Sequence, residues 1–106
     1  MRLAERQCEP CQVGGAPLTA AEAQKLARET PEWSVLEKAI ERQFQFKDFR
    51  EAVAFVNRVA DAAEEQGHHP DISIYYSKVR LTLSTHKTGG LTENDFILAA
   101  KIDRLV

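Results

Sequence analysis

The sequence lacks the features that mark membrane proteins and secreted proteins. No apolar run approaches the ~20 residues that a membrane-spanning helix needs. Residues 1–6 lack the apolar central stretch of a secretory signal peptide. Only two cysteines occur, Cys8 and Cys11. We therefore expect a cytoplasmic protein without membrane contacts, in a compartment that keeps thiols reduced.

An excess of charge of one sign is also missing. The 14 basic and 16 acidic residues are interleaved along the chain and give a net charge of −2. A protein that binds nucleic acid would gather Lys and Arg on one face, so no nucleic-acid partner is expected. The length of 106 residues suits one domain with a core of its own.

The first 17 residues carry no hydrophobic periodicity. We predict a flexible, irregular leader over residues 1–17 and a single domain over residues 18–106. The leader contains a Cys-x-x-Cys pair, Cys8 and Cys11, which resembles half of a zinc ribbon or a redox pair. Neither the second half of a ribbon nor a preceding strand is present, so reduced thiols are favoured. An intermolecular zinc site or disulfide stays open.

Local signals predict where the first two helices begin and end. Thr19-Ala-Ala-Glu22 is a capping box, and Pro31 stops the helix that follows it. Asp48 caps a second helix, and Gly67 stands where a left-handed C-terminal cap is expected. The apolar stripe that we predict on the second helix consists of Phe49, Ala52, Val53, Val56, Val59, Ala60 and Ala63.

Four strands and a third helix complete the prediction. The strands are expected over residues 33–36, 39–46, 72–76 and 78–85, and the helix begins at Thr92. The resulting order is α-β-β-α-β-β-α, with neighbouring strands joined as hairpins. This order favours the α+β class: a four-stranded antiparallel sheet with three helices packed on one face.

All three histidines lie between positions 68 and 86. Because imidazole titrates near neutral pH, it can both donate and accept protons during a reaction. His68 and His69 follow the predicted helix end at Gly67, and His86 leaves the end of a strand. Each of them could instead be a surface or capping residue. Spacing alone leaves these two interpretations evenly balanced.

The spacing of the histidines and their neighbours resembles a known family. Glu64-Glu-Gln-Gly-His68-His69-Pro70 is followed by Tyr76, by His86 and by Asp95, in the pattern of the pterin-4a-carbinolamine dehydratases. Flanking segments such as Pro31-Glu-Trp33 and Phe55-Val-Asn-Arg-Val-Ala-Asp61 resemble bacterial members. The resemblance covers residues 18–105.

The resemblance implies an activity as well as a fold. Members dehydrate 4a-hydroxytetrahydropterin to quinonoid dihydropterin, which recycles a tetrahydrobiopterin-type cofactor after an aromatic amino acid hydroxylase has turned over. They need neither a bound cofactor nor a metal, and they assemble as homodimers or homotetramers. His68 and His86 are implied as general acids, and His69 as the residue that orients the pterin. Ile72 stands where animal members usually carry Trp.

Four further residues are site candidates in this family, where they contact the substrate or support the histidines: Glu64, Pro70, Tyr76 and Asp95. From the residues alone, Asp95 is equally suited to bond the Thr92 amide at a helix start or to fix a histidine tautomer. Glu64 could belong to a solvated helix face. Tyr76 could simply be a sheet residue.

Other functions remain as alternatives. The histidines, acids and cysteines could supply zinc ligands, but no His-Glu-x-x-His spacing is present and adjacent histidines rarely converge on one ion. Some members of the family also stabilise dimers of a transcription factor, so the chain could be a protein-binding module. Another pterin-linked role, such as one in molybdopterin metabolism, is a third alternative.

Overall fold

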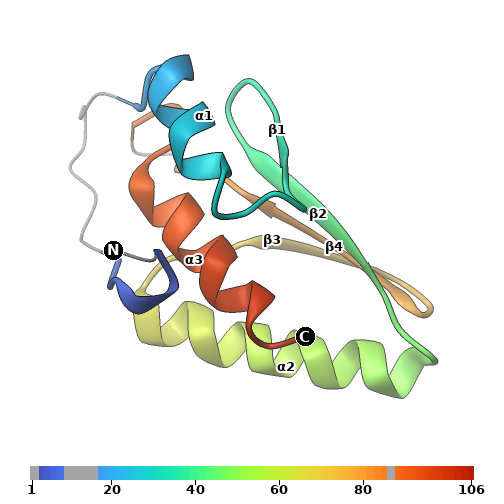
Figure 1. Cartoon of the computed structure of the whole chain (residues 1–106). Helices are drawn as coiled ribbons and strands as arrows, with labels where there is room; N and C mark the ends of the chain where they lie inside the picture. Colours follow the sequence, from blue (N-terminus) through green and yellow to red (C-terminus); the bar gives the residue numbers. More distant parts are fainter. Residues whose placement is uncertain (1–2, 9–16, 86–87) are drawn as a thin grey trace.

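A computed structural model describes residues 3–8, 17–85 and 88–106 of the chain. Helices and strands follow the predicted order, which confirms the α+β class (Figure 1). None of the helices in the described part combines the length and the apolar character that a membrane crossing requires. The elements are η1 (Leu3–Glu5, a short 3-10 helix), α1 (Ala20–Ala27), β1 (Ser34–Val35), β2 (Ile40–Gln45), α2 (Phe49–Gln66), β3 (Asp71–Tyr75), β4 (Lys78–Leu83) and α3 (Glu93–Asp103).

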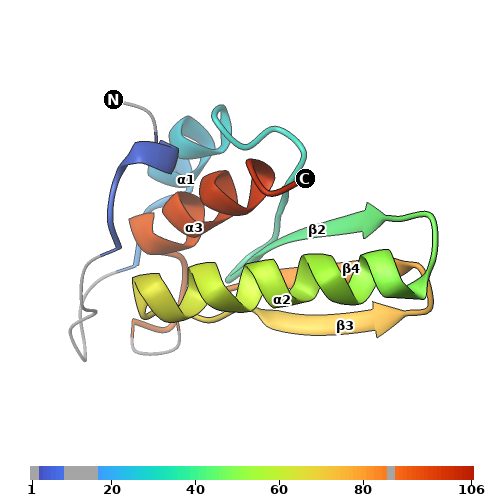
Figure 2. The same cartoon turned by 90° about the horizontal axis from the view of Figure 1, so that it is seen from below.

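The strands of the described chain form one antiparallel sheet in the order β1-β2-β4-β3. Phe44 on β2 pairs with Val79 on β4, and both side chains are buried. The helices cover this face of the sheet, with α2 running along β4 and β3 (Figure 2). The next pair, Gln43 and Arg80, points to the opposite, open face because side chains alternate along a strand.

The buried side of α2 differs from the predicted stripe. Phe55, which the prediction omitted, is fully buried, and its ring centroid lies 4.7 Å from that of Phe44 and 4.9 Å from that of Phe46. Phe49 is instead 50% exposed and Ala60 is exposed. The sheet lies against Ala52, Phe55, Val59 and Ala63. The predicted apolar stripe was therefore centred to one side of the buried face.

The ends of the first two helices follow the local signals closely. Thr19 and Glu22 form the predicted capping box, and the hydrogen bond from the Thr19 amide holds the pKa of Glu22 below its usual 4.5. Asp48 accepts the Glu51 amide at 2.9 Å. Gly67 ends α2 with a φ of 65°, in the left-handed region that favours glycine. This cap turns the chain out of α2 immediately before His68.

Residues 3–8 correct the expectation of a flexible leader over that stretch. The Leu3 side chain is fully buried in the core next to α3. Lys101 on α3 donates to the Ala4 carbonyl oxygen at 2.9 Å, and the side-chain oxygen of Gln66 accepts the Cys8 amide at 2.8 Å. These residues therefore pack as part of the domain. The boundary between residues 17 and 18 stays a prediction, and Cys11 lies outside the described residues.

The hairpin between β3 and β4 also departs from the prediction. The strand expected over residues 72–76 ends at Tyr75, which pairs with Lys78. Tyr76 therefore lies in the turn, with a φ of 56° and 71% of its surface exposed. A positive φ is unusual for a side chain of this size, and the sequence offers no glycine or asparagine at Tyr76 or Ser77 to signal the turn.

Candidate functional site

Three chain segments that are far apart in sequence meet at one end of the molecule. They are the C-terminal end of α2, the segment after β4 and the N-terminal end of α3 (Figure 2). His68 comes from the first segment, Thr85 from the second and Asp95 from the third. All three residues are buried, and the Asp95 side chain has no exposed surface. The sheet and two helix ends therefore enclose a small polar cluster.

Asp95 is the centre of this cluster. Its Oδ1 lies 2.6 Å from Nε2 of His68. Its Oδ2 accepts the Thr85 hydroxyl at 2.9 Å and the Thr92 amide at 3.0 Å. One carboxylate thus bonds the helix start and contacts a histidine ring, whereas its role in fixing the histidine tautomer stays a prediction. The carboxylate is thus buried with three hydrogen-bond partners, which offset the loss of its water.

His69 makes a contact of the same type in different surroundings. Its Nε2 lies 2.5 Å from Oε2 of Glu64, one turn back on α2. The His69 side chain is 59% exposed and the Glu64 side chain is 76% exposed. An exposed contact of this kind contributes only ~0–1 kcal/mol, because water competes for both partners. The ring of His69 is therefore only weakly held.

The remaining candidates are spread differently. Pro70 is half-buried and directly precedes β3, beside the histidine pair. Tyr76 lies at the other end of β3, and five strand residues at ~3.3 Å each make that end about 16 Å distant. Within one chain, Tyr76 therefore does not join the His68 cluster. His86 lies outside the described residues, so its role stays a prediction.

Thr85 is the part of the cluster that the sequence reasoning missed. Its hydroxyl lies 2.9 Å from both Asp95 Oδ2 and Thr92 Oγ1. Its carbonyl oxygen accepts the amides of Thr88 and Gly90, both at 3.3 Å, which fixes the backbone at this point. The only available signal was its position immediately before His86. That position says nothing of a carboxylate ten residues later.

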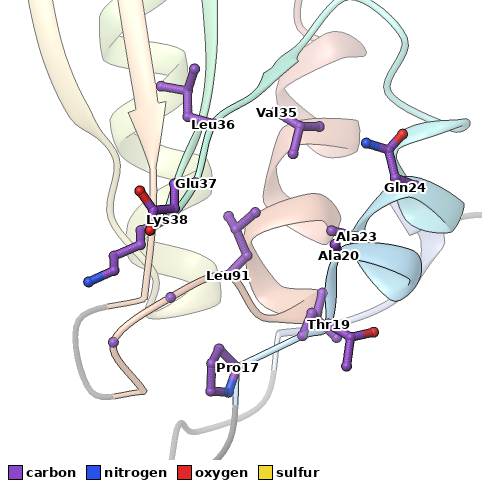
Figure 3. Close-up of a pocket in the computed structure, with 13 residues that line it drawn as sticks. Pro17, Thr19, Ala20, Ala23, Gln24, Val35, Leu36, Glu37, Lys38 and Leu91 are labelled. Carbon is purple, nitrogen blue, oxygen red and sulfur yellow. The ribbon is translucent and has the colours of Figure 1, made fainter.

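A separate pocket of about 450 Å³ opens between α1 and the β1–β2 hairpin (Figure 3). Leu36 from the hairpin and Leu91 from the segment before α3 line it, together with charged Lys38. The volume is within the usual range for small ligands. Neither His68 nor Asp95 is among its lining residues, although Gly90 of the lining donates its amide to the Thr85 carbonyl oxygen.

No group of three or more His, Cys, Asp or Glu side chains suitable for a metal ion occurs within residues 3–8, 17–85 and 88–106. Cys8 is half-buried, and its Sγ lies 3.6 Å from the Asn94 carbonyl oxygen. Because Cys11 and His86 lie outside those ranges, the zinc and disulfide alternatives for the Cys-x-x-Cys segment stay predictions.

Comparison with known proteins decides the family. The family described as pterin 4 alpha carbinolamine dehydratase matches residues 16–105, most of the chain. The chain belongs to this family. A relative from Rubrobacter xylanophilus, provisionally named pterin-4-alpha-carbinolamine dehydratase, is 52% identical over 104 residues, which cover 97% of each chain. A relative from Methylococcus capsulatus with the same provisional name is 48% identical over 105 residues, 97% of this chain and 92% of the relative.

Solved structures of the pterin dehydratase family agree in fold. A transcriptional coactivator/pterin dehydratase from Brucella melitensis superposes with a TM-score of 0.80 and 36% identity, covering 84% of this chain and 97% of the other. A pterin dehydratase-like protein described as a RuBisCO assembly factor in the alpha-carboxysome gives a TM-score of 0.57 at 26% identity, covering 69% and 84%. The two solved proteins thus have different described roles.

Proposed function

We propose that this chain is an active dehydratase that converts 4a-hydroxytetrahydropterin to quinonoid dihydropterin and water. Family membership supports the substrate class. The observation that carries the proposal is the buried contact between His68 and Asp95, because a protein that served only as a scaffold has no need to bury this polar pair. A carboxylate that orients a histidine is a common arrangement in sites that transfer protons.

The reaction needs one proton donor and one proton acceptor. The C4a–O bond breaks, and its electron pair leaves with the hydroxyl group, which takes up a proton and departs as water. The electron pair on N5 forms the new double bond to C4a as N5 loses its proton to water. Positioned acid–base groups typically accelerate such steps ~10²–10⁴-fold. Neither a redox change nor a change in the carbon skeleton occurs.

We assign the general acid role to His68 and His86 and the role of orienting the pterin to His69. The fixed surroundings of His68 support the first role, since a held ring can meet a reacting atom in one geometry. The exposed ring of His69 supports the second role, since it can adjust to a bound ligand. Pro70 and Glu64 support the position of His69, one through the chain direction and the other through the side-chain contact.

The direct experiment measures dehydration of 4a-hydroxytetrahydropterin by stopped flow against the spontaneous rate. We expect the wild-type chain to accelerate the reaction, His68→Ala and His86→Ala to lose kcat, and His69→Ala mainly to raise KM. Glu65→Gln is the control, because this exposed residue neighbours Glu64 on α2 and has no part in the proposed chemistry. Near-normal kcat/KM in all three histidine variants would refute the mechanism.

We further propose that the substrate comes from an aromatic amino acid hydroxylase, the reaction class that generates 4a-hydroxypterins, and that dehydration recycles the pterin once a reductant has returned the quinonoid product to the tetrahydro form. The measurement is a coupled assay with such a reductant present, in which hydroxylase turnover is followed with and without this chain at limiting pterin. A hydroxylase gene next to this one would support the proposal. A neighbourhood of molybdopterin synthesis genes, and no effect in the coupled assay, would favour the other pterin-linked role.

The partner that we propose is a second copy of this chain. Strand β3 is last in the sheet order of the described chain, and Ile72 and Ile74 on it are 37% and 39% exposed. An edge strand with apolar side chains is suited to pair with a second copy. Antiparallel pairing centred on Ser73 would bring Tyr76 of the partner subunit opposite Pro70. Light scattering should give a dimer or tetramer, and Ile74→Lys should give smaller species.

A protein-binding role is the second candidate. The described roles of the two solved relatives, one a coactivator and the other an assembly factor, favour it. Here the open sheet face around Gln43 and Arg80 offers a polar surface that the described helices leave uncovered. The two functions are separable, because His68→Ala should abolish dehydration and leave such binding unchanged. Absence of any dehydration by the wild-type chain would leave this second function alone.

A further inference from the structure

The Thr85 hydroxyl lies within hydrogen-bond distance of Asp95, the carboxylate that contacts His68. The side chain is buried, with 4% of the residue exposed. Its Oγ1 has two oxygen neighbours, Asp95 Oδ2 and Thr92 Oγ1, both at 2.9 Å. A hydroxyl has one proton to donate and can accept in return. The direction of its two hydrogen bonds therefore follows from which neighbouring atoms carry a proton.

The count favours donation to Asp95. The Thr92 amide can only donate, and it donates to the same Oδ2 atom at 3.0 Å. An ionised carboxylate can only accept, so the Thr85 proton points to Oδ2 and the Thr92 hydroxyl donates to Thr85. With two donors on Oδ2, the carboxylate charge is stabilised in a buried place.

The consequence reaches the histidine ring. When Asp95 is ionised, the short 2.6 Å contact from Oδ1 to Nε2 of His68 requires the proton on the nitrogen. The His68 ring then carries its proton on Nε2, and Nδ1 is the ring nitrogen that remains for proton transfer to and from other groups. Within the described chain, the hydrogen bond of the His68 ring is made by Nε2 alone.

We propose that Thr85 is a positioning residue: by donating to Asp95 it fixes the Nε2–H tautomer of His68 and makes Nδ1 the nitrogen that takes up a proton and then delivers it to the departing hydroxyl group of the substrate. The proposal rests on the proposed dehydratase function for its substrate, but the tautomer is a property of the protein alone. Thr85 touches neither the histidine nor the reacting atoms directly. It acts through the carboxylate of Asp95.

The test compares Thr85→Val, which keeps the shape and removes the hydroxyl, with Thr85→Ser, which keeps the hydroxyl. Ring nitrogen chemical shifts from ¹⁵N NMR report the tautomer of His68. We expect one Nε2–H form in the wild-type chain and in Thr85→Ser, and a mixture of tautomers in Thr85→Val. In kinetics, Thr85→Val should lower kcat about 10-fold with KM changed less than about 2-fold, as for other residues that orient a histidine. Thr85→Ser should regain most of kcat.

The matched control is Thr82→Val on β4. Thr82 also donates to a carboxylate, Glu41 at 3.3 Å, but on the open face away from His68. It should change neither the tautomer nor kcat. If Thr85→Val does not fold, Thr85→Ala removes the same hydroxyl with less bulk and is measured in the same way. An unchanged single tautomer together with unchanged kcat in the folded hydroxyl-free variant would overturn the proposal.

Failure of the two proposals can be told apart. If the wild-type chain does not dehydrate the pterin but the tautomer changes in Thr85→Val, the dehydratase function fails and the effect of Thr85 on His68 stands. If the wild-type chain is active and Thr85→Val matches it in kcat and in tautomer, only the role of Thr85 fails. A wild-type ring protonated on Nδ1 alone would refute the assignment of Nδ1 as the exchanging nitrogen.

Discussion

Two histidines that are adjacent in sequence each contact a carboxylate, but one pair is buried and the other is exposed. The His68 and Asp95 side chains are 10% and 0% exposed, and the carboxylate has three hydrogen-bond partners from three segments. The His69 and Glu64 side chains are 59% and 76% exposed, and both belong to the same end of α2. The two histidine–carboxylate contacts are similar in length, but their surroundings lead us to expect different interaction energies. The buried pair has lost its water and depends on its partners, whereas the exposed pair exchanges with solvent.

The largest expected difference between the pairs is in catalysis. Asp95→Asn places an amide where three donors converge, so His68 loses the acceptor that fixes its ring, and kcat should fall about 10²-fold. Glu64→Gln should leave kcat within about 2-fold, because Glu64 contacts only His69, whose proposed role is to orient the pterin and not to transfer a proton. Stopped-flow dehydration assays of both variants decide the matter. Equal losses from the two substitutions would show that burial does not separate the pairs.

Stability should separate the pairs as well. Asp95→Ala leaves the Thr85 hydroxyl, the Thr92 amide and the His68 ring without their buried acceptor, which should lower the free energy of unfolding by about 1–3 kcal/mol. Glu64→Ala removes an exposed partner and should change it by less than about 0.5 kcal/mol. Urea unfolding followed by circular dichroism measures both values. A loss below 0.5 kcal/mol in Asp95→Ala would contradict the accounting of its hydrogen bonds.

The common origin of the two pairs is the end of α2 at Gly67. Its φ of 65° is left-handed, and an added Cβ would meet no atom within 4 Å, so Gly67→Ala should cost about 1 kcal/mol through backbone strain alone. Gly67→Asn should cost less, because asparagine tolerates this region better. Thermal unfolding gives the order of stability. Equal melting temperatures for the wild type and Gly67→Ala would mean that the chain can leave α2 in another way.

The smallest expected effect is the coupling within the exposed pair. A double-mutant cycle of Glu64→Gln and His69→Gln should give a coupling free energy below about 0.5 kcal/mol, and added salt should reduce it further. The same cycle on Asp95→Asn and His68→Gln should give a clearly larger value that salt hardly changes. Urea titrations at low and high salt provide both. A large, salt-independent coupling between Glu64 and His69 would remove the distinction between the two pairs.

The features predicted correctly from the sequence are those set by local chemistry. Asp48 and Glu51 at the start of α2 lie within one helical turn, and Gly67 at its end needs only its own backbone freedom. The prediction of which side of α2 faces the sheet was wrong at Phe49, because several neighbouring stripes on the helix are apolar. Only the packing of Phe55 against β2 selects among them.

Two residues of the buried cluster, His68 and Asp95, were named from the sequence, but the contacts that join the cluster were not. The histidine pair and Asp95 came from the spacing of a known family, and the contact between His68 and Asp95 spans 27 residues. Thr85 joins this cluster because β4 ends beside the start of α3, which no local pattern indicates. Tyr76 was misjudged as a strand residue for the opposite reason: its positive φ has no signal in the residues around it.

The carboxylate of Asp95 begins a helix and orients a ring with the same two oxygens. Loosening of the first turn of α3 would therefore release His68 as well. On heating, the dehydratase activity should then be lost at a temperature where the sheet is still folded. The temperature of inactivation and the melting temperature of the fold therefore need not coincide. Variation at position 95 is equally constrained, because a replacement that improved one task would have to preserve the other.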